Sequence, residues 1–173
     1  MSTLHRVNFG LALLLVGGAV VGWYFLPERI PVHFGIDGAP DRWADRSLLS
    51  WFGPTAIGIL TTGLMYGLNR LIPRRPDLVN IPNKKLFLAL SPEARAPVIR
   101  EVQGLVYSLC TVILLMFWFI QGSTFVSARG GNSQGLMILV LLLSLIVLPG
   151  LVLVSLSRVN RAMEQARRRE RVE

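Results

Sequence analysis

The sequence has few charged residues, a single cysteine and only two histidines. Charged residues make up 16% of the 173 positions and apolar residues 52%, whereas soluble domains average about 25% charged. The lone Cys110 excludes an internal disulfide framework and a zinc site built on several cysteines. High apolar content excludes an intrinsically disordered chain. The length allows one domain of ordinary size.

What the sequence does contain is four long uncharged runs. A transmembrane helix needs roughly 20 mostly apolar residues, and buried helices of a soluble bundle seldom run so long without a polar face. We therefore predict an all-α integral membrane protein with an irregular extracytoplasmic loop between its first two helices. The predicted helices are residues 8–26, 47–69, 102–126 and 135–157. Together they form one membrane domain over residues 1–157, and residues 158–173 form a basic cytoplasmic tail that continues the last helix.

The first run lacks a small-residue cleavage site and ends in large aromatic residues, Trp23, Tyr24 and Phe25. It is therefore interpreted as an uncleaved membrane anchor rather than a signal peptide. Large aromatic side chains are typical of membrane interfaces. The same reasoning places Trp43, Trp51 and Trp118 at or near the outer boundary.

The distribution of lysine and arginine predicts the orientation. Of the 18 cations, one lies in the N-terminal segment, seven in the second loop and six in the tail, which leaves three in the first loop and one in the third. Because cytoplasmic segments carry the excess of Lys and Arg, both termini are expected in the cytoplasm. We expect a multi-pass protein of the bacterial cytoplasmic (inner) membrane. The net charge of +8 then reflects topology, and no nucleic-acid partner is expected.

The predicted helices carry no Asp, Glu, Lys, Arg or His in their central parts. Pumps, proton relays and voltage sensors depend on such residues, so these classes are disfavoured, while a pore lined by backbone carbonyls stays open. Small residues are spaced for close helix packing, which we expect to occur within the chain. These pairs are Gly18 and Gly22, Gly63 and Gly67, and Gly104 and Ser108. Pro149 predicts a kink in the fourth helix.

The first loop is the densest candidate site. Three prolines and two glycines between residues 26 and 43 preclude a continuous helix, residues 32–34 resemble a short strand, and Asp37-Gly38 predicts a turn. Asp41 is predicted to cap the helix that leads through Trp43 into the second span. Function outside the cell is expected to depend on the residues around His33.

His33, Asp37, Asp41 and Asp45 recur every four residues. The glycines and Pro40 break any helix here, so this spacing does not place them on one face. Three readings stay open: His33, Asp37 and Asp41 around a metal ion or catalytic centre, a His–Asp hydrogen bond with structural aspartates, or a surface for an external ligand. No cofactor and no catalytic residue are assigned, because nucleotide-binding and nucleophile motifs are absent from the sequence.

Two short motifs resemble a known family. The first is Pro27-x-x-Ile30-Pro31-x-His33-Phe34 followed by Gly38-x-x-Asp41, and the second is Val79-Asn80-Ile81-Pro82-Asn83-Lys84. Together with the helix placement they resemble a bacterial membrane domain of unknown function found at the N-terminus of SdpI-type immunity proteins. The resemblance implies a short, four-helix member. It also implies that a ligand or motif site includes Pro31, His33, Phe34, Gly38 and Asp41, with Asn80, Pro82 and Asn83.

The second loop contains a predicted helix start at Ser91-Pro92-Glu93. Before it, Leu86, Phe87, Leu88 and Leu90 form an apolar cluster that is expected to lie in the inner membrane interface or on a partner. Asn80 and Asn83 are expected to shape the turn.

The preferred function is a non-enzymatic membrane protein of accessory, immunity or sensor type. The alternatives are a membrane enzyme or metal site at the first loop and a packing subunit of a larger complex. The expected partners are the lipid bilayer, anionic lipid headgroups at the basic tail, and another membrane protein or an extracellular peptide.

Overall fold

The computed structural model describes residues 3–170, and most of these are helical. In chain order the elements are α1 (Thr3–Trp23), β1 (Arg29–Phe34), β2 (Pro40–Asp45), α2 (Leu48–Leu71), η1 (Pro76–Leu78), α3 (Lys84–Ala89), α4 (Pro92–Ala128), α5 (Gln134–Leu142), η2 (Leu143–Val147) and α6 (Leu148–Glu170). Four helical segments are long and apolar enough to cross a membrane: α1, α2, α4 and the continuous run from α5 to α6. The predicted class, a four-span α-helical membrane protein, is confirmed.

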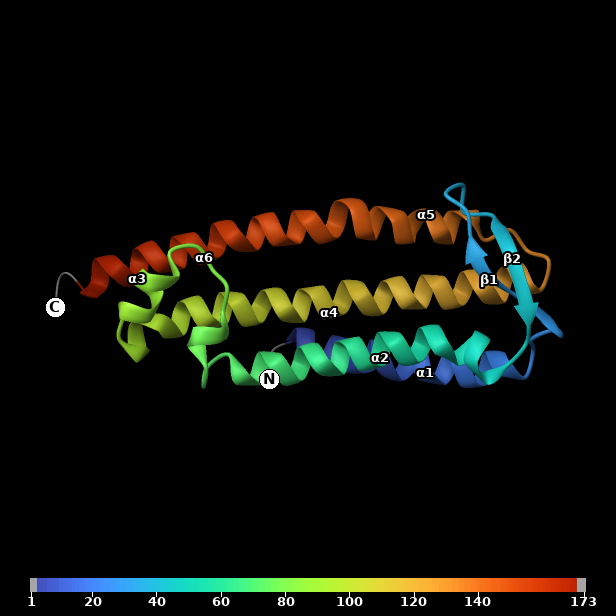
Figure 1. Cartoon of the computed structure of the whole chain (residues 1–173), viewed down its shortest axis with the longest axis horizontal. Helices are drawn as coiled ribbons and strands as arrows, with labels where there is room; N and C mark the ends of the chain where they lie inside the picture. Colours follow the sequence, from blue (N-terminus) through green and yellow to red (C-terminus); the bar gives the residue numbers. More distant parts are fainter. Residues whose placement is uncertain (1–2, 171–173) are drawn as a thin grey trace.

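The helices form an elongated bundle with α4 in the centre (Figure 1). Helix α4 contacts α1 and α2 on one side and α5 and α6 on the other. The two strands cover one end of the bundle, called here the hairpin end. Helix α3 and the loop before it lie at the opposite end, called here the α3 end. The central helix thus holds the other spans together.

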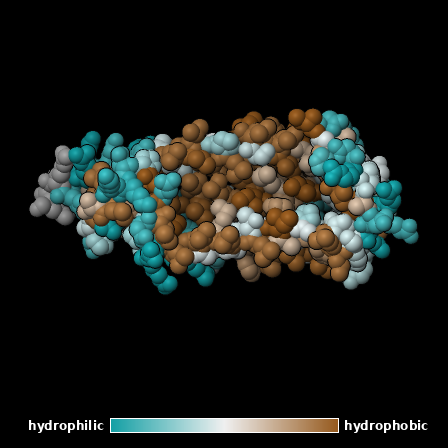
Figure 2. Space-filling model, viewed as in Figure 1, coloured by the Kyte–Doolittle hydropathy of each residue, from teal (hydrophilic) through white to brown (hydrophobic). Residues whose placement is uncertain are grey.

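On the face seen in Figure 2, an apolar band covers the middle of the molecule, and polar side chains gather at both ends. Large apolar side chains within this band are exposed, among them Leu13 and Leu14 of α1, Leu60 and Leu64 of α2, and Leu145 and Leu153 of the last span. A bundle in water would turn such side chains inward, whereas lipid is as apolar as they are. The exterior therefore fits contact with a lipid bilayer.

Two of the spans are longer than the membrane requires. Helix α4 and the run from α5 to α6 each have 37 residues, about 55 Å at 1.5 Å per residue, against a hydrocarbon core of about 30 Å. Both begin or end well outside the predicted ranges of 102–126 and 135–157. Charge marked those boundaries in the sequence, but arginine and glutamate are good helix formers in water. The predicted continuation of the last helix into the tail is confirmed.

A small hydrophobic core closes the α3 end. Its buried members are Val79, Ile81, Phe87, Leu90, Val98, Val159, Ala162, Met163 and Ala166. The expected exposed cluster is thus mostly internal: Phe87 and Leu90 are buried against α4 and α6, and Leu88 stays exposed. The expectation of an interface or partner contact was wrong for these two residues. The extended ends of α4 and α6 supply their apolar partners.

Serine residues cap the N-termini of two of the spans. The Ser47 hydroxyl accepts a hydrogen bond from the Ser50 amide at the start of α2, and the Ser91 hydroxyl accepts one from the Ala94 amide at the start of α4. The predicted helix start at Ser91 is confirmed. The prediction that Asp41 caps the second span was wrong, because Asp41 lies in β2. Strand β2 continues to Asp45, so α2 begins only at Leu48.

Close packing within the bundle follows the predictions only in part. A Cβ at Gly22 would lie 2.8 Å from the Trp51 ring, and one at Gly18 would lie 3.6 Å from the Trp118 ring, so α1 uses both glycines for packing. A Cβ at Gly63, Gly67 or Gly104 would meet nothing within 4 Å. Trp118 therefore packs on α1 ten residues before the end of α4.

The fourth span departs from regular α-helix just before Pro149. Residues Leu143–Val147 form a π-helical turn. Pro149 has no N–H and its ring crowds the preceding turn, and a π-bulge is one way to accommodate that defect. The sequence predicted a kink at Pro149, and the structure has a π-helical turn just before this residue, within a continuous helix.

Candidate functional site

The first loop is an ordered antiparallel hairpin rather than an irregular segment. Strands β1 and β2 pair from Arg29 opposite Asp45 to Phe34 opposite Pro40, with register shifts on both sides of His33. The predicted turn is confirmed: the Gly38 amide donates to the Gly35 carbonyl at 2.9 Å, and Gly38 has φ of +77°. The prolines prevent this segment from forming a helix. Pairing of β1 with β2 supplies hydrogen bonds to backbone N–H and C=O groups that would bind water in an irregular loop.

The hairpin is fixed against the bundle at its base. Ile30 is fully buried in a cluster with Leu26 and Trp51. The Arg46 side chain donates to the Leu26 carbonyl at 2.8 Å, and its guanidinium lies 5.0 Å from the centre of the Trp23 ring. These contacts join the end of α1, the hairpin and the start of α2. The base of the hairpin therefore has a defined position.

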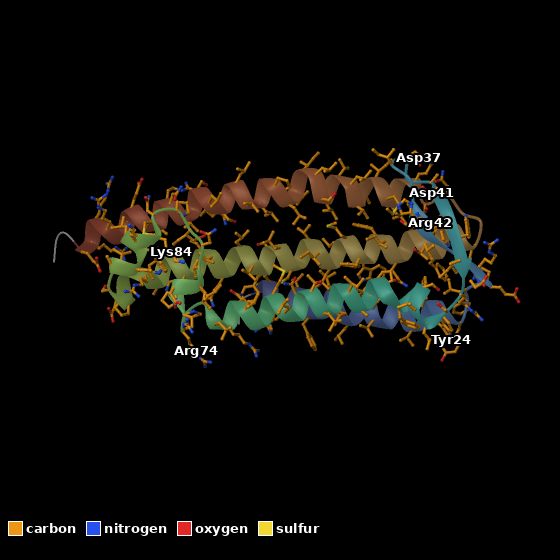
Figure 3. The ribbon with its side chains drawn as sticks, viewed as in Figure 1. Tyr24, Asp37, Asp41, Arg42, Arg74 and Lys84 are labelled. Carbon is orange, nitrogen blue, oxygen red and sulfur yellow. The ribbon has the colours of Figure 1, made fainter. Side chains whose placement is uncertain are left out.

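The tip of the hairpin reaches the start of the fourth span. A Cβ at Gly38 would lie 3.0 Å from the Gln134 carbonyl oxygen and 3.2 Å from the Met137 Cβ. Only glycine combines this positive φ with so close an approach. The hairpin thus bridges all four spans at one end, and Figure 3 shows Asp37, Asp41 and Arg42 there.

His33 and Asp41 form the most specific polar contact of the hairpin. The His33 Nδ1 atom lies 2.6 Å from the Asp41 Oδ1 atom, and each side chain is 53% exposed. The contact realises one of the possibilities that the sequence left open, a His–Asp hydrogen bond. It orients the imidazole and leaves both groups accessible from water.

The geometry does not assemble a metal centre. The Asp37 carboxylate accepts a hydrogen bond from the Ala39 amide at 3.0 Å and stabilises the turn. Within residues 3–170, no group of three or more His, Cys, Asp or Glu side chains is placed to hold a metal ion. Of the three candidate ligands His33, Asp37 and Asp41, only the first and last are in direct contact. Zinc sites normally use at least three protein ligands, so the residues present do not fit one.

A groove of about 340 Å³ lies beside β1 at the hairpin end of the bundle. Pro31, Val32 and Phe34 form its hairpin wall, and α2 and α4 supply the rest, including Pro54 and Thr124. Pro31 is buried on the bundle, whereas His33, two residues further on, is exposed, because the register shift between them breaks the regular strand alternation. The hairpin thus offers a mostly apolar groove next to a polar pair.

The second motif lies at the other end of the molecule. Asn80, Pro82 and Asn83 belong to the loop between η1 and α3, at the α3 end (Figure 1). Asn83 has φ of 56°, a left-handed conformation that asparagine tolerates better than most residues. Pro82 and Asn83 line a pocket of about 310 Å³ against α6. The two motifs therefore do not form one site.

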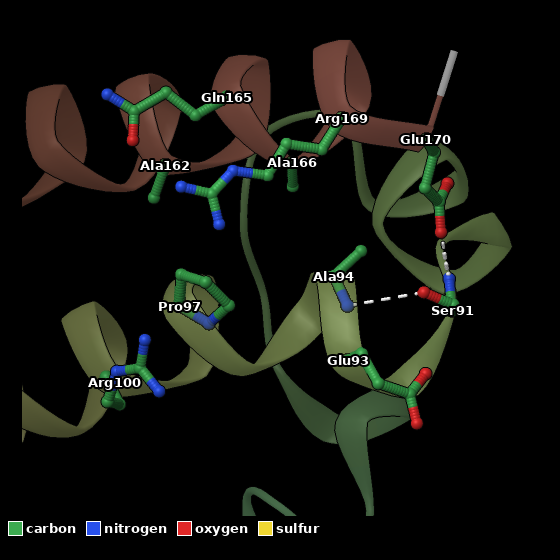
Figure 4. A pocket seen from close by; sticks show the side chains of 10 residues that line it. All are labelled: Ser91, Glu93, Ala94, Pro97, Arg100, Ala162, Gln165, Ala166, Arg169 and Glu170. Atoms are coloured by element: carbon green, nitrogen blue, oxygen red, sulfur yellow. Dashed lines mark hydrogen bonds between the residues drawn. The ribbon is translucent and has the colours of Figure 1, made fainter. Parts of the chain in front are cut away.

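The α3 end also contains a cleft of about 380 Å³ between the start of α4 and the end of α6. The Glu170 carboxylate accepts a hydrogen bond from the Ser91 amide across this cleft (Figure 4). That bond lowers the pKa of the Glu170 carboxyl below its ordinary value. Arg100 and Arg169 also line the cleft. Their charges are balanced by Glu93 and Glu170, so its lining has no net charge.

Two clusters of buried polar side chains join the spans, and the sequence reasoning missed both. Asn8 donates to the Tyr66 hydroxyl at 3.0 Å and to the Tyr107 carbonyl at 2.9 Å, and it accepts from the Thr111 hydroxyl at 2.6 Å. In the other cluster, Gln121 accepts from Thr55 and donates to the Trp51 carbonyl. The available signal was an uncharged polar residue within each run, since such residues often join membrane helices.

Comparison with known proteins gives one match. The pattern of a family described as a domain of unknown function (DUF1648) matches residues 10–58. This segment contains most of α1, the hairpin and the first half of α2, and it excludes Asn80, Pro82 and Asn83. No curated protein and no solved structure matches the chain. The chain is therefore similar to DUF1648 over the part that contains His33, Asp41 and the hairpin and α2 walls of the groove, while its α4 wall lies outside the match.

Proposed function

We propose that this protein is a non-enzymatic receptor of the bacterial cytoplasmic membrane, of accessory, immunity or sensor type, that binds an extracytoplasmic partner at its hairpin. The observation that carries the proposal is the exposed His33–Asp41 pair on a hairpin fixed to all four spans. A binding surface on a rigid support loses little conformational entropy when a partner binds. The resemblance to the SdpI-type N-terminal domain supports the same proposal.

The groove beside β1 suggests the kind of partner. Its wall of Pro31, Val32 and Phe34 favours apolar side chains, and the nearby His33 and Asp41 provide polar atoms for orientation. Binding sites commonly combine an apolar surface with a few such polar groups. An amphipathic peptide, or the exposed end of another membrane protein, has this combination. In this proposal the four spans form one membrane domain, and the basic tail lies in the cytoplasm.

Crosslinking at the hairpin tests the proposed function. Ile36 is 93% exposed at the turn and is replaced by a photo-crosslinking amino acid in living cells. We expect a crosslinked species that is lost in Asp41→Asn and His33→Ala variants, because the first removes the carboxylate charge and the second removes the imidazole. A small captured peptide would indicate immunity, and a captured membrane protein would indicate an accessory role. The proposal is wrong if the crosslinking yield at Ile36 equals the yield at lipid-facing Leu60. It is also wrong if the His33 and Asp41 substitutions leave the yield at Ile36 unchanged.

Cysteine labelling tests the orientation. Ile36→Cys places a thiol at the hairpin end and Lys85→Cys places one at the α3 end, while the native Cys110 is buried. A membrane-impermeant maleimide added to intact cells should label the first variant and should label the second only after permeabilisation. Labelling of Lys85→Cys alone in intact cells would reverse the proposed topology.

The His33–Asp41 pair also favours a second candidate, a membrane enzyme or metal site. A carboxylate bonded to one ring nitrogen is the arrangement that fixes a histidine for metal binding through the other nitrogen. A further ligand would then have to come from a substrate or a partner. Metal analysis of the protein purified in mild detergent decides this. A stoichiometric metal that is lost in His33→Ala would replace the receptor proposal.

A further inference from the structure

A cleft of about 310 Å³ opens between α2, α4 and the η1 segment near the α3 end. Its apolar lining includes Met65, Leu68 and Ile72 on one side and Val102 and Val106 on the other. The α2 residues lie in the last turns of a membrane span and just beyond it. The cleft therefore lies near the end of a membrane span. A lipid acyl chain matches this lining.

One polar group in this cleft is left without a partner. Asn69 lines the cleft and is only 1% exposed. Its Oδ1 atom has no hydrogen-bond partner among residues 3–170, although its Nδ2 atom reaches the Gln103 carbonyl at 3.5 Å. Buried polar atoms are nearly always paired. This unpaired acceptor has almost no accessible surface, so a ligand that brings a hydrogen-bond donor reaches it only if the Asn69 side chain turns toward the cleft.

The surroundings of the cleft are positively charged. Arg70 lies in the last turn of α2 and Arg74 follows it, and neither forms an ion pair within the described part of the chain. Arg75 is held by Asp77 through two hydrogen bonds of 2.9 and 3.0 Å. Figure 3 shows Arg74 and Lys84 at this end of the bundle. Cations at a membrane surface attract anionic lipids.

We propose that this cleft is a binding site for phosphatidylglycerol. The acyl chain lies along Leu68, Val102 and Val106, a headgroup hydroxyl donates to the Asn69 Oδ1 atom, and the phosphate is near Arg70 and Arg74. Phosphatidylcholine has neither a hydroxyl donor nor a net negative charge, so it serves as the discriminating lipid. The site does not depend on the orientation of the protein or on the hairpin. It is also separate from the arginines of the C-terminal tail.

Native mass spectrometry of the full chain in mild detergent tests the proposal, with phosphatidylglycerol and phosphatidylcholine added in separate titrations. The wild-type protein should bind phosphatidylglycerol more tightly. Asn69→Leu should weaken that binding about fivefold, the value of one neutral hydrogen bond, and should leave phosphatidylcholine binding unchanged. An Arg70→Gln, Arg74→Gln double variant should weaken it further, because each cation near the surface contributes about fivefold.

A matched control separates lipid binding from helix packing. Gln103→Leu removes the reciprocal bond from the Gln103 side chain to the Asn69 carbonyl, 3.2 Å long, and leaves the Asn69 side chain in place. This variant should retain the lipid preference of the wild type. The proposal is overturned if the two lipids bind equally, if Gln103→Leu loses the preference as Asn69→Leu does, or if Asn69→Leu keeps it in full. In the last case, charge alone selects the lipid.

Discussion

The Thr111 hydroxyl of α4 donates a hydrogen bond of 2.6 Å to the Asn8 side chain of α1, inside the bundle. Asn8 is 2% exposed and also donates to groups on α2 and α4. One asparagine therefore joins three of the four spans. In a membrane, where no hydrophobic effect draws helices together, such bonds are among the few specific attractions.

Replacing Asn8 should loosen the bundle. Asn8→Leu removes three hydrogen bonds, each worth about 0.6 kcal/mol in membrane bundles, so we expect a loss of about 2 kcal/mol in the free energy of unfolding. Titration with a denaturing detergent measures it. Ser144→Ala removes only a bond to the Leu141 carbonyl of the same helix and should have little effect. Equal effects of the two substitutions would contradict the role of Asn8.

Two glycines of α2 should respond to alanine in opposite ways. A Cβ at Gly58 would lie 2.8 Å from the Phe117 ring, whereas one at Gly63 would meet nothing within 4 Å. Gly58→Ala should therefore cost about 1–3 kcal/mol through overpacking. Gly63→Ala should be neutral or stabilise by up to about 1 kcal/mol through helix propensity. Unfolding of both variants in detergent checks the sign. A destabilising Gly63→Ala would indicate that Gly63 is in close contact with another chain.

Two glycines with similar backbone conformations separate the effect of the hairpin's tip contact on stability from the effect of a positive φ. Gly38 and Gly130 both have positive φ, of 77° and 80°, but only Gly38 approaches another element, at Gln134. Alanine at either position incurs the left-handed penalty of about 1–2 kcal/mol. Gly38→Ala should lose more than Gly130→Ala and should also increase amide exchange across β1 and β2. Hydrogen exchange of the two variants would show equal protection if the tip were not docked.

The contact between Glu170 and Ser91 predicts a dependence on pH. The hydrogen bond from the Ser91 amide lowers the pKa of the Glu170 carboxyl, so its stabilising effect is present above the ordinary carboxyl pKa of 4.5. The effect is lost as the pH falls through the lowered value. The difference in Tm between wild type and Glu170→Gln should therefore be present at neutral pH and shrink in acid. Glu164→Gln, on the same helix, serves as the control and should show no such trend.

Much of the membrane architecture follows from composition along the chain. Four uncharged runs predicted four spans because burying charge in lipid is costly, and the structure has these spans. The Asp37-Gly38 turn and the Ser91 cap were also predictable, because each depends on neighbouring residues alone. Residues of the first motif were identified as candidates, but their arrangement was not. Whether His33 would contact Asp37 or Asp41 depends on the strand register.

The remaining features required the tertiary structure. The sequence alone does not distinguish Asn8 and Gln121 from other uncharged polar residues, because their hydrogen-bond partners lie on other helices. Phe87 and Leu90 resembled interface residues because nothing local shows that α4 and α6 continue beside them. The sequence determined the spans, since the cost of charge in lipid is a local property. The tertiary structure decided which side chains meet, because those contacts join residues tens of positions apart.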